Sequence, residues 1–419
     1  MTPPQGLEVA IIGGGLAGAL TARVLREAHR VTIYERAKDA GEVGAALAIG
    51  PTGVRILESL GFDQERAGSI PTGLIKLYDH KGNLGHEQYL DTTEAYGAEH
   101  LAYHRSDLRN EFLRLATADS EQLGINGCPA KIVWGCEVTA VDAEAGTLIL
   151  STGEKIHADL IVAADGIKSV ARPVVVGDAA FSTTKASGIS AFRFLIETQE
   201  IQDKMGHLPK IFKPLPGHKY CLTMLFSTDG SKRGMVIYPC RNFELVNFLC
   251  FVTDDKLKVN STRSWSAPGD REEMVSLFSD DFPDWAVDHL RLADNIKLWQ
   301  LHDQDPLPTY TVGRVVLIGD AAHAMTPHQG QGATQAVEDA EGFRLFLRAG
   351  TTRDGVPTIL KDYDSVRRPR ASQIQLHTRA AQSNRKPEDA LRYEKYNWTY
   401  PGIIKGLERV KAGEELVQF

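Results

Sequence analysis

The chain has 419 residues, more than one hydrophobic core ordinarily supports, so we expect two domains. Its 42% hydrophobic and 24% charged residues are typical of a globular protein, and its net charge of −7 argues against nucleic acid as the main ligand. No apolar run reaches the roughly 18 residues of a membrane-spanning helix, and the first segment lacks a basic signal region. The five cysteines form no CxxC pair. We therefore expect a cytoplasmic protein with neither a metal site nor a membrane partner.

The stretch EVAIIGGGLAGALTARVLREAHRVTIYE, residues 8–35, predicts a strand, a glycine-rich turn, a helix and a second strand. Gly13 permits a tight turn, Gly15 lets backbone amides approach a pyrophosphate, and Gly18 lets the helix pack on the strand. The positive end of the helix favours phosphates, and Glu35 closes the second strand where a ribose hydroxyl would bind. The elements fall in the order of a dinucleotide-binding unit.

Two more buried strands end on an aspartate. HADLIVAADGIKSVAR contains a strand that ends on Asp165, and VVLIGDAAH contains one that ends on Asp320. Such strands place a carboxylate at the carboxyl edge of a parallel sheet, where α/β proteins bind ligands. Taken alone, either aspartate could instead cap the helix that follows it.

Residues 174–295 change to alternating patterns that predict strands of one antiparallel sheet. The strands are expected in ASGISAFRFLIET, KYCLTMLFST, GMVIYP and ELVNFLCFVTD, with CRNF as a hairpin turn. Such a sheet could form one wall of a substrate cavity between two domains. The tail from residue 351 is charged and predicts helices. Its basic run at 367–370 is expected to be a solvated or packing face, since the whole chain is acidic.

The initial GxGxxG, the central DG and the late GDAAHAMTPHQGQGATQAVEDA resemble the three motifs of flavin-dependent aromatic hydroxylases. These are the group A monooxygenases of the para-hydroxybenzoate hydroxylase fold, and the chain resembles their salicylate hydroxylase-like branch from residue 8 to about residue 375. The resemblance implies an α/β protein: a Rossmann-like FAD-binding domain with a parallel sheet, interleaved with an antiparallel-sheet substrate domain and followed by a C-terminal helical segment.

The expected FAD-binding domain is discontinuous and comprises residues 1–75, 100–173 and 296–350. The expected substrate domain comprises residues 76–99 and 174–295, and the helical region is 351–419.

The resemblance gives the late motif its roles. Asp320 would meet the ribityl chain or pyrophosphate of FAD, and Pro327 would lie near the reactive face of the isoalloxazine. Gly330, Gly332 and Ala333 would offer backbone amides to the pyrimidine end, where only glycine lets the chain pass so near a flat ring. The helix that begins near Ala333 would direct its positive end at the flavin.

Other cofactor contacts implied by the resemblance are Asp165 of the DG motif, Gly44 and Ala48 after the second strand, and Arg105 of YHRSDLRNEFLRLA. Arg109 is the second candidate in that helix, the alternative being a solvated helix face. In the late motif, Glu338 and Asp339 are expected to be caps or ion-pair partners, and His323 to be structural. The role of His328 stays open.

On the substrate side, the resemblance assigns Arg193 and Tyr238 to holding a phenolate oxygen. The alternatives are that Arg193 faces water or pairs with a carboxylate, and that Tyr238 is sheet packing. Phe194 stands where relatives have glycine, which changes the expected pocket shape.

The implied function is that of an FAD monooxygenase, using NADPH or NADH as a transient co-substrate. It would insert one atom of O2 into a phenolic or other electron-rich aromatic molecule through a flavin C4a-hydroperoxide, in secondary metabolism. The alternatives are a decarboxylating salicylate-type hydroxylase, an epoxidase or indole oxidase of the same fold, and a flavin-binding redox sensor. No second GxGxxG is present, so a separate nicotinamide domain is not expected. The expected partners are the aromatic substrate and O2, and the chain is expected to be a monomer or homodimer.

Overall fold

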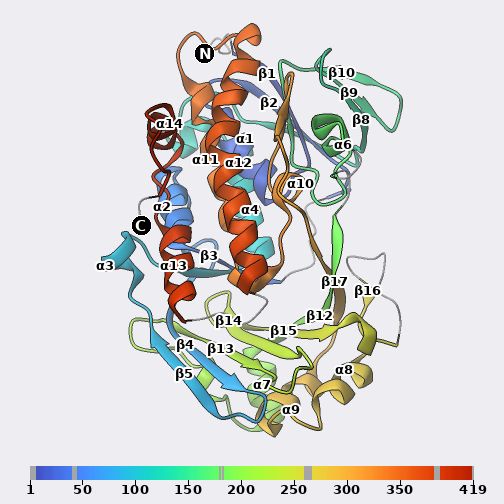
Figure 1. Cartoon of the computed structure of the whole chain (residues 1–419), viewed down its shortest axis with the longest axis vertical. Coiled ribbons are helices and arrows are strands. Elements are labelled where there is room, and N and C mark those ends of the chain that lie inside the picture. Colours follow the sequence, from blue (N-terminus) through green and yellow to red (C-terminus); the bar gives the residue numbers. More distant parts are fainter. Residues whose placement is uncertain are drawn as a thin grey trace.

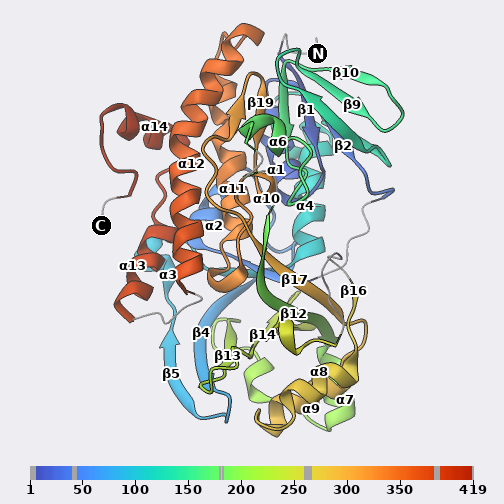
Figure 2. The same ribbon diagram turned by 45° about the vertical axis from the view of Figure 1, so that its right-hand side comes forward.

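The computed structural model of the chain describes residues 6–39, 45–178, 181, 184–258, 267–381 and 387–417. Two large sheets organise it, one in each half of the view in Figure 1. The longer helices lie along one side of the upper sheet, a small antiparallel sheet and short helices lie on its other side, and the lower sheet lies beneath it (Figures 1 and 2).

The upper sheet has six strands in the order β18-β19-β11-β1-β2-β7. The strands are β1 (Glu8–Ile12), β2 (Arg30–Glu35), β7 (Lys131–Trp134), β11 (Leu160–Ala163), β18 (Thr311–Val312) and β19 (Val315–Leu317). All pairings except that of the edge strand β18 are parallel. In register, Ile12 lies beside Ala163 and Ala163 beside Leu317. The turns that follow these three strands therefore meet at one edge, as the sequence predicts.

The helices on this sheet pack their apolar faces into one core. Helix α1 (Leu16–Leu25) connects β1 to β2 and packs against α4 (Arg105–Thr117) and α11 (Gly332–Gly342). Leu20 and Leu25 are buried there with Phe112 and Val337. The 26-residue helix α12 (Val356–Ala381) lies alongside, followed by α13 (Pro387–Trp398) and α14 (Ile403–Lys411) (Figure 2). Within the described ranges, no helix is long and apolar enough to cross a membrane.

The lower sheet has ten strands in the order β16-β17-β12-β15-β14-β13-β4-β6-β3, with β5 paired to β4. The strands are β3 (Ala46–Ile49), β4 (Ile70–Asp79), β5 (Leu84–Tyr89), β6 (Leu101–His104), β12 (Lys185–Glu197), β13 (Tyr220–Phe226), β14 (Gly234–Cys240), β15 (Leu245–Thr253), β16 (Ala267–Pro268) and β17 (Lys297–Asp303). Most pairings are antiparallel, and residues 241–244 form the hairpin turn expected for CRNF. The domain boundaries stay a prediction; β17 lies in a segment assigned above to the cofactor domain.

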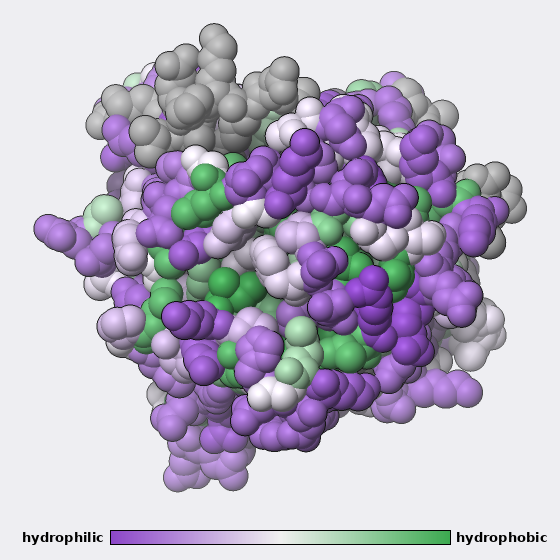
Figure 3. All heavy atoms as spheres, turned by 90° about the horizontal axis from the view of Figure 1, so that it is seen from below, coloured by the Kyte–Doolittle hydropathy of each residue, from purple (hydrophilic) through white to green (hydrophobic). Residues whose placement is uncertain are grey.

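The two faces of this sheet differ because side chains alternate along each strand. On the outer face, Phe192 and Phe194 of β12 are buried with residues of the helices α7 (Thr198–Met205), α8 (Arg271–Phe278) and α9 (Asp284–Leu292). The Phe194 ring stacks on Phe248, with centroids 4.9 Å apart. Phe194 therefore points away from the inner face that carries Arg193. Seen from below, hydrophobic residues on this end of the molecule form small groups among hydrophilic ones (Figure 3).

Shorter elements complete the chain. The small antiparallel sheet comprises β8 (Val138–Asp142), β9 (Thr147–Leu150) and β10 (Lys155–His157). The remaining helices are α2 (Pro51–Ser59), α3 (Thr92–Tyr96), α5 (Ser120–Leu123), α6 (Arg172–Val176) and α10 (Asp320–His323), with 3₁₀ turns η2 (Lys210–Phe212), η3 (Asp254–Lys256), η4 (Pro327–Gln329), η5 (Phe343–Leu347) and η6 (Arg353–Gly355).

Candidate active site

The glycine-rich turn after β1 has three glycines with different constraints. Gly13 has φ +95°, and a Cβ there would lie 2.6 Å from the Ala164 carbonyl oxygen. A Cβ on Gly18 would lie 2.0 Å from the Gly13 carbonyl oxygen, so α1 packs on β1 only with glycine at this position. A Cβ on Gly15 would meet no atom within 4 Å. Gly15 therefore borders open space at the amino end of α1, where backbone amides are available to a phosphate.

Glu35 and Arg109 both bind the backbone of this turn. The Gly14 amide donates to Glu35 Oε2 at 2.7 Å, and the Ala37 amide donates to Glu35 Oε1 at 2.8 Å. Arg109 Nε donates to the Gly14 carbonyl at 2.7 Å, and its guanidinium lies over the Trp134 ring. Arg109 is buried, so the solvated helix face considered for it is wrong.

The two aspartates after β11 and β19 differ in environment. Asp165 Oδ2 accepts from the Val170 amide at 2.8 Å, while Asp165 Oδ1 is enclosed with no hydrogen-bond partner among the described residues. Burial raises the pKa of Asp165. Asp320 is the first residue of α10 and is exposed. The N-cap of the helix α6 that follows Asp165 is Ala171, and the N-cap of α10 is Gly319, so neither aspartate occupies the capping position considered for it.

Arg172 ties the loops after β11 and β19 together. It is fully buried, and its guanidinium donates to the carbonyls of Ile167 at 2.9 Å, Asp320 at 2.9 Å and Ala321 at 2.8 Å. These loops carry the two aspartates, so Arg172 fixes their separation.

Arg105 connects the cofactor side with the substrate side. It begins α4, and its backbone amide donates to the Ala45 carbonyl at 2.8 Å. Burial lowers the pKa of Arg105 to about 10; the charge of Asp320 opposes this, and those of Arg193 and Arg109 add to it. The Arg105 guanidinium is therefore within electrostatic range of Asp320 and Arg193 together. Ala48 is half-buried in β3 nearby, and Gly44 lies outside the described residues.

The segment after α10 forms a glycine-bounded turn before α11. Pro327 begins the 3₁₀ turn η4, and Gly330 ends it with φ +62°. A Cβ on Gly330 or Gly332 would meet no atom within 4 Å. Gly332 and Ala333 form the first turn of the 11-residue helix α11, so their amides have no acceptor within the helix. This end of α11 presents donors and a positive dipole to open space.

Behind this turn lies a buried ionic cluster. Asp339 Oδ2 accepts from the Gly319 amide at 2.8 Å and lies 2.6 Å from His323 Nε2, while Asp339 Oδ1 accepts from Arg367 Nε at 3.0 Å. Burial opposes ionisation of Asp339, but its interactions with His323 and Arg367 outweigh this and lower its pKa. Arg367 Nη1 also donates to Glu338 at 2.6 Å. His323, Glu338 and Asp339 therefore make structural contacts that join α10, α11 and α12.

Arg370 completes the cluster. It donates to Glu338 Oε1 at 2.9 Å, to the Tyr396 carbonyl at 2.5 Å and to the Asn397 carbonyl at 2.9 Å. Arg367 and Arg370 are fully buried. The basic run is thus a packing face at these two positions, and it joins α11 to the end of α13.

The inner face of the lower sheet carries the substrate candidates. The half-buried Arg193 has its guanidinium 4.9 Å from the centre of the Trp299 ring, and within the described part of the chain its Nε has no hydrogen-bond partner. Burial lowers the pKa of Arg193, and Tyr238 opposes that shift. Tyr238 is buried, and the centre of its ring lies 5.8 Å from that of Tyr220. Burial raises the pKa of Tyr238, so its hydroxyl is neutral at physiological pH.

The surface around Arg193 is apolar. Residues of β12, β14, β15 and β17 form one hydrophobic cluster on this face: Ile189, Ala191, Val236, Leu249, Phe251 and Leu301. The His328 ring stacks against Phe251 with centroids 6.1 Å apart, and its Nδ1 is enclosed without a partner. Burial lowers the pKa of His328. The loop that begins at Pro327 therefore contacts the same wall that presents Arg193.

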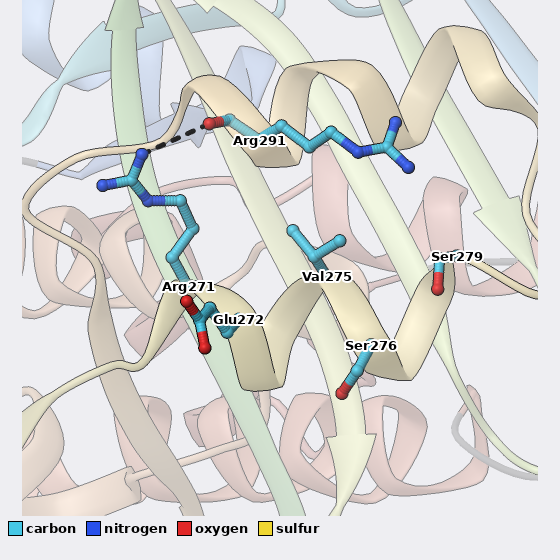
Figure 4. Close-up of a pocket in the computed structure, with 6 residues that line it drawn as sticks. All are labelled: Arg271, Glu272, Val275, Ser276, Ser279 and Arg291. Carbon is cyan, nitrogen blue, oxygen red and sulfur yellow. Dashed lines mark hydrogen bonds between the residues drawn. The ribbon is translucent and has the colours of Figure 1, made fainter.

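The described residues also form a pocket away from the predicted site residues. A shallow pocket between α8 and α9 lies on the outer side of the lower sheet, lined by Arg271, Glu272, Val275, Ser276, Ser279 and Arg291 (Figure 4). It includes none of the predicted site residues. Across the part of the chain that the structure describes, no group of His, Cys, Asp and Glu side chains could hold a metal ion.

The arrangement fits FAD at three points. The glycine turn beside α1 has room for a pyrophosphate, the start of α11 offers unpaired amides, and Asp165 Oδ1 is a buried acceptor without a protein donor. The glycine turn follows β1 and Asp165 follows β11. The start of α11 comes after β19, by way of α10 and η4. This is where a doubly wound sheet binds a dinucleotide.

Comparison with known proteins agrees. The family described as "FAD binding domain" matches residues 6–378. Hispidin-3-hydroxylase of Neonothopanus nambi is 35% identical over 372 residues, covering 87% of this chain and 86% of that protein. A salicylate hydroxylase of Pseudomonas putida is 31% identical over 396 residues, covering 88% and 84%. A solved salicylate hydroxylase substrate complex is 27% identical with a TM-score of 0.73, covering 96% of this chain and 97% of that one.

The chain belongs to this family of FAD-binding flavoproteins. It is an FAD-dependent monooxygenase with NAD(P)H as co-substrate, and its fold is that of the FAD-dependent aromatic hydroxylases. The expected recognition, fold class, enzyme class and cofactor are confirmed; the roles of individual residues stay predictions.

Sequence reasoning missed two residues of the site. Trp299 supports Arg193 from β17, and Arg172 joins the two aspartate loops. The alternation in KLWQLHD signals that Trp299 and Leu301 share one face, but not which strand is paired with it. Arg172 carries no local signal for this role, because its partners in the second loop, Asp320 and Ala321, are about 150 residues away.

Proposed function

We propose that the enzyme hydroxylates a phenolic or other electron-rich ring that is bound as an oxyanion beside Arg193. The observation that carries this proposal is the guanidinium itself, which is half-buried on an apolar wall with an enclosed Nε and no ion-pair partner among the described carboxylates. A buried cation without a counter-charge is costly. A ligand oxyanion would supply both the missing charge and the missing acceptor.

The protein's part in the reaction is to bind, orient and polarise the ring. Arg193 favours the ionised form of the ring oxygen. The ionised oxygen donates electron density to the neighbouring ring carbons. Neutral Tyr238 can donate a second hydrogen bond to that oxygen but cannot act as a base at physiological pH. The apolar cluster of Leu249 and Phe251 excludes water that would quench the oxidant.

FAD, when bound, would pass the electrons of NAD(P)H to O2 and so supply an electrophilic oxygen to the electron-rich ring. One oxygen atom enters the ring as hydroxyl and the other leaves as water, with NAD(P)H and one proton consumed. The residues proposed to hold FAD are Gly13, Gly15, Gly18, Glu35, Ala48, Arg105, Asp165, Asp320, Gly330, Gly332 and Ala333, with Pro327 at the reactive face.

His328 is the best-placed candidate to take the proton of the substrate hydroxyl. Its lowered pKa keeps the ring neutral near pH 7, its Nδ1 is enclosed without a partner, and it belongs to the loop that contacts the substrate wall. The tautomer of the neutral His328 ring is assigned from the hydrogen bonds that its two nitrogens make.

Paired phenols with and without an ortho carboxylate test the reaction type. NAD(P)H consumption and product masses are measured for both. Oxygen gained with every carbon kept supports the proposal; oxygen gained with carbon dioxide lost from the carboxylate member favours the salicylate-type alternative, which the relation to salicylate hydroxylase keeps open. Peroxide as the sole oxygen product would contradict hydroxylation and favour an oxidase or sensor.

A further inference from the structure

The hairpin between β14 and β15 has an unusual backbone. Arg241, Asn242 and Phe243 have φ of 47°, 50° and 66°, so three consecutive residues with side chains adopt the left-handed region. L-residues visit this region rarely and usually singly, because the Cβ approaches the carbonyl oxygen. Such strain persists only where surrounding contacts hold it.

Contacts from several elements hold this hairpin, and those of the Arg241 side chain come from the start of α4 and the residue before it. Arg241 Nε donates to Asp107 Oδ2 at 2.6 Å and Arg241 Nη2 donates to Asp107 Oδ1 at 2.8 Å, a bidentate pair. Arg241 Nη2 also lies 2.7 Å from His104 Nδ1. The Asn242 amide donates to the Gly68 carbonyl at 3.2 Å. We call Arg241, Asp107 and His104 the hairpin latch.

His104 fits the latch as a hydrogen-bond acceptor. A guanidinium only donates, so His104 Nδ1 accepts and the ring carries its proton on Nε2. Burial lowers the pKa of His104 and the charge of Arg241 adds to this, against the opposing charge of Asp107. The neutral ring therefore suits its partner.

The latch joins the two sides of the active site. Arg241 follows Tyr238 by three residues along the chain, while His104 directly precedes Arg105 and Asp107 lies in the first turn of α4. Arg105 is in turn within electrostatic range of Arg193. A second joint supports the same interface: Asn247, opposite Tyr238 in the sheet, accepts from the Ala46 amide of β3 at 3.1 Å.

We propose that Arg241 and Asp107 are positioning residues that set the distance between the strand bearing Tyr238 and the helix bearing Arg105. They hold the substrate ring in register with the reacting centre. The proposal rests on the proposed function for the roles of Tyr238 and Arg193. A bidentate arginine–carboxylate pair fixes both distance and orientation, which a lysine at the same place would not do. The pair is one of the contacts that hold the strained turn at the end of the hairpin.

The test compares Arg241→Gln, Arg241→Lys and Asp107→Asn with wild-type holoenzyme. The matched control is Arg271→Gln. Arg271 is an exposed arginine of α8, outside the site, and its Nη2 lies 3.2 Å from Asp294 Oδ1. FAD content and melting temperature are measured first. The substrate dissociation constant is then read from the change in flavin absorbance, without turnover, and the hydroxylated product per NAD(P)H consumed is determined last.

For Arg241→Gln we expect retained FAD, about a fivefold weaker substrate affinity and a similar fall in product per NAD(P)H, with peroxide making up the difference. Asp107→Asn should behave alike, and Arg241→Lys should restore only part of the loss. The control should match wild type. Wild-type affinity and coupling in both Arg241→Gln and Asp107→Asn would overturn the proposal, as would full rescue by lysine.

Asn242→Gly separates positioning from stability. Glycine adopts the left-handed region freely, so this variant relieves strain while the ion pair remains. We expect an equal or higher melting temperature with unchanged coupling. Loss of coupling in this variant would show that the backbone strain, and not the pair, matters, and would overturn the proposal. Failure of the proposed function is distinguishable, because wild-type enzyme would then give peroxide and no hydroxylated product.

Discussion

At the scale of single residues, the glycines of the first turn separate packing from ligand binding. Gly18 has no room for a side chain, since a Cβ would lie 2.0 Å from the Gly13 carbonyl oxygen. Gly15 has room and borders the place proposed for the pyrophosphate. Both belong to the same motif, so a pattern match alone treats them alike.

Gly18→Ala should lower the free energy of unfolding by about 1–3 kcal/mol through overpacking and should also weaken FAD binding. Gly15→Ala should leave the melting temperature of the FAD-free protein nearly unchanged and weaken FAD binding at least as strongly. Calorimetry and FAD titration of the two variants check this. A Gly15→Ala protein that binds FAD normally would remove the pyrophosphate from this position.

Asp320→Ala should weaken FAD binding by about tenfold, the cost of one good polar contact to a ligand. The side chain is exposed at the edge where three strand ends meet, so the fold should tolerate its loss. Asp280→Ala, an exposed aspartate between α8 and α9, is the control. FAD retained during gel filtration is the measurement, and a fully loaded, fully reducible Asp320→Ala enzyme would contradict the assigned role.

At the scale of elements, helix α11 does two tasks at its two ends. Its first turn presents amides beside Gly332, and its later residues hold the tail of the chain. Glu338 pairs with Arg370, and Glu341 Oε2 accepts from the Ile403 amide at the start of α14, at 2.9 Å. The C-terminal helices are thereby anchored on the helix that faces the cofactor.

Glu341 gives this anchor a dependence on pH. Burial raises the pKa of Glu341 from 4.5 to about 7 in the folded protein. The folded state therefore binds its proton more tightly than the unfolded state, and the free energy of unfolding falls as the pH rises between these values, by at most about 3 kcal/mol.

In Glu341→Gln this loss should disappear, because the amide oxygen still accepts from Ile403 and carries no charge. The variant should match wild type near pH 4 and exceed it at pH 8. Denaturant unfolding at several pH values provides the comparison. Parallel pH profiles of the two proteins would contradict the shifted pKa.

At the scale of the whole molecule, the sequence predicts what is local and misses what is long-range. The βαβ unit with Glu35, the strands before Asp165 and Asp320, and the CRNF turn follow from short patterns and agree with the structure. The pairing of Arg193 with Trp299 and of Arg241 with Asp107 joins residues more than 100 positions apart, and no local periodicity encodes it. The lower sheet runs from β3 to β16 and so combines segments that the predicted boundaries place in different domains.

The central claim is that Arg193 holds the ring oxyanion, and Arg193→Gln tests it most directly. Product formed per NAD(P)H consumed is measured with a phenol that wild-type enzyme hydroxylates. We predict that FAD content and flavin reduction are kept, that substrate affinity falls by about tenfold or more through loss of a charge-assisted hydrogen bond, and that peroxide replaces most of the product. Wild-type affinity and full coupling in this variant would contradict the account and leave Arg193 with a structural role on Trp299.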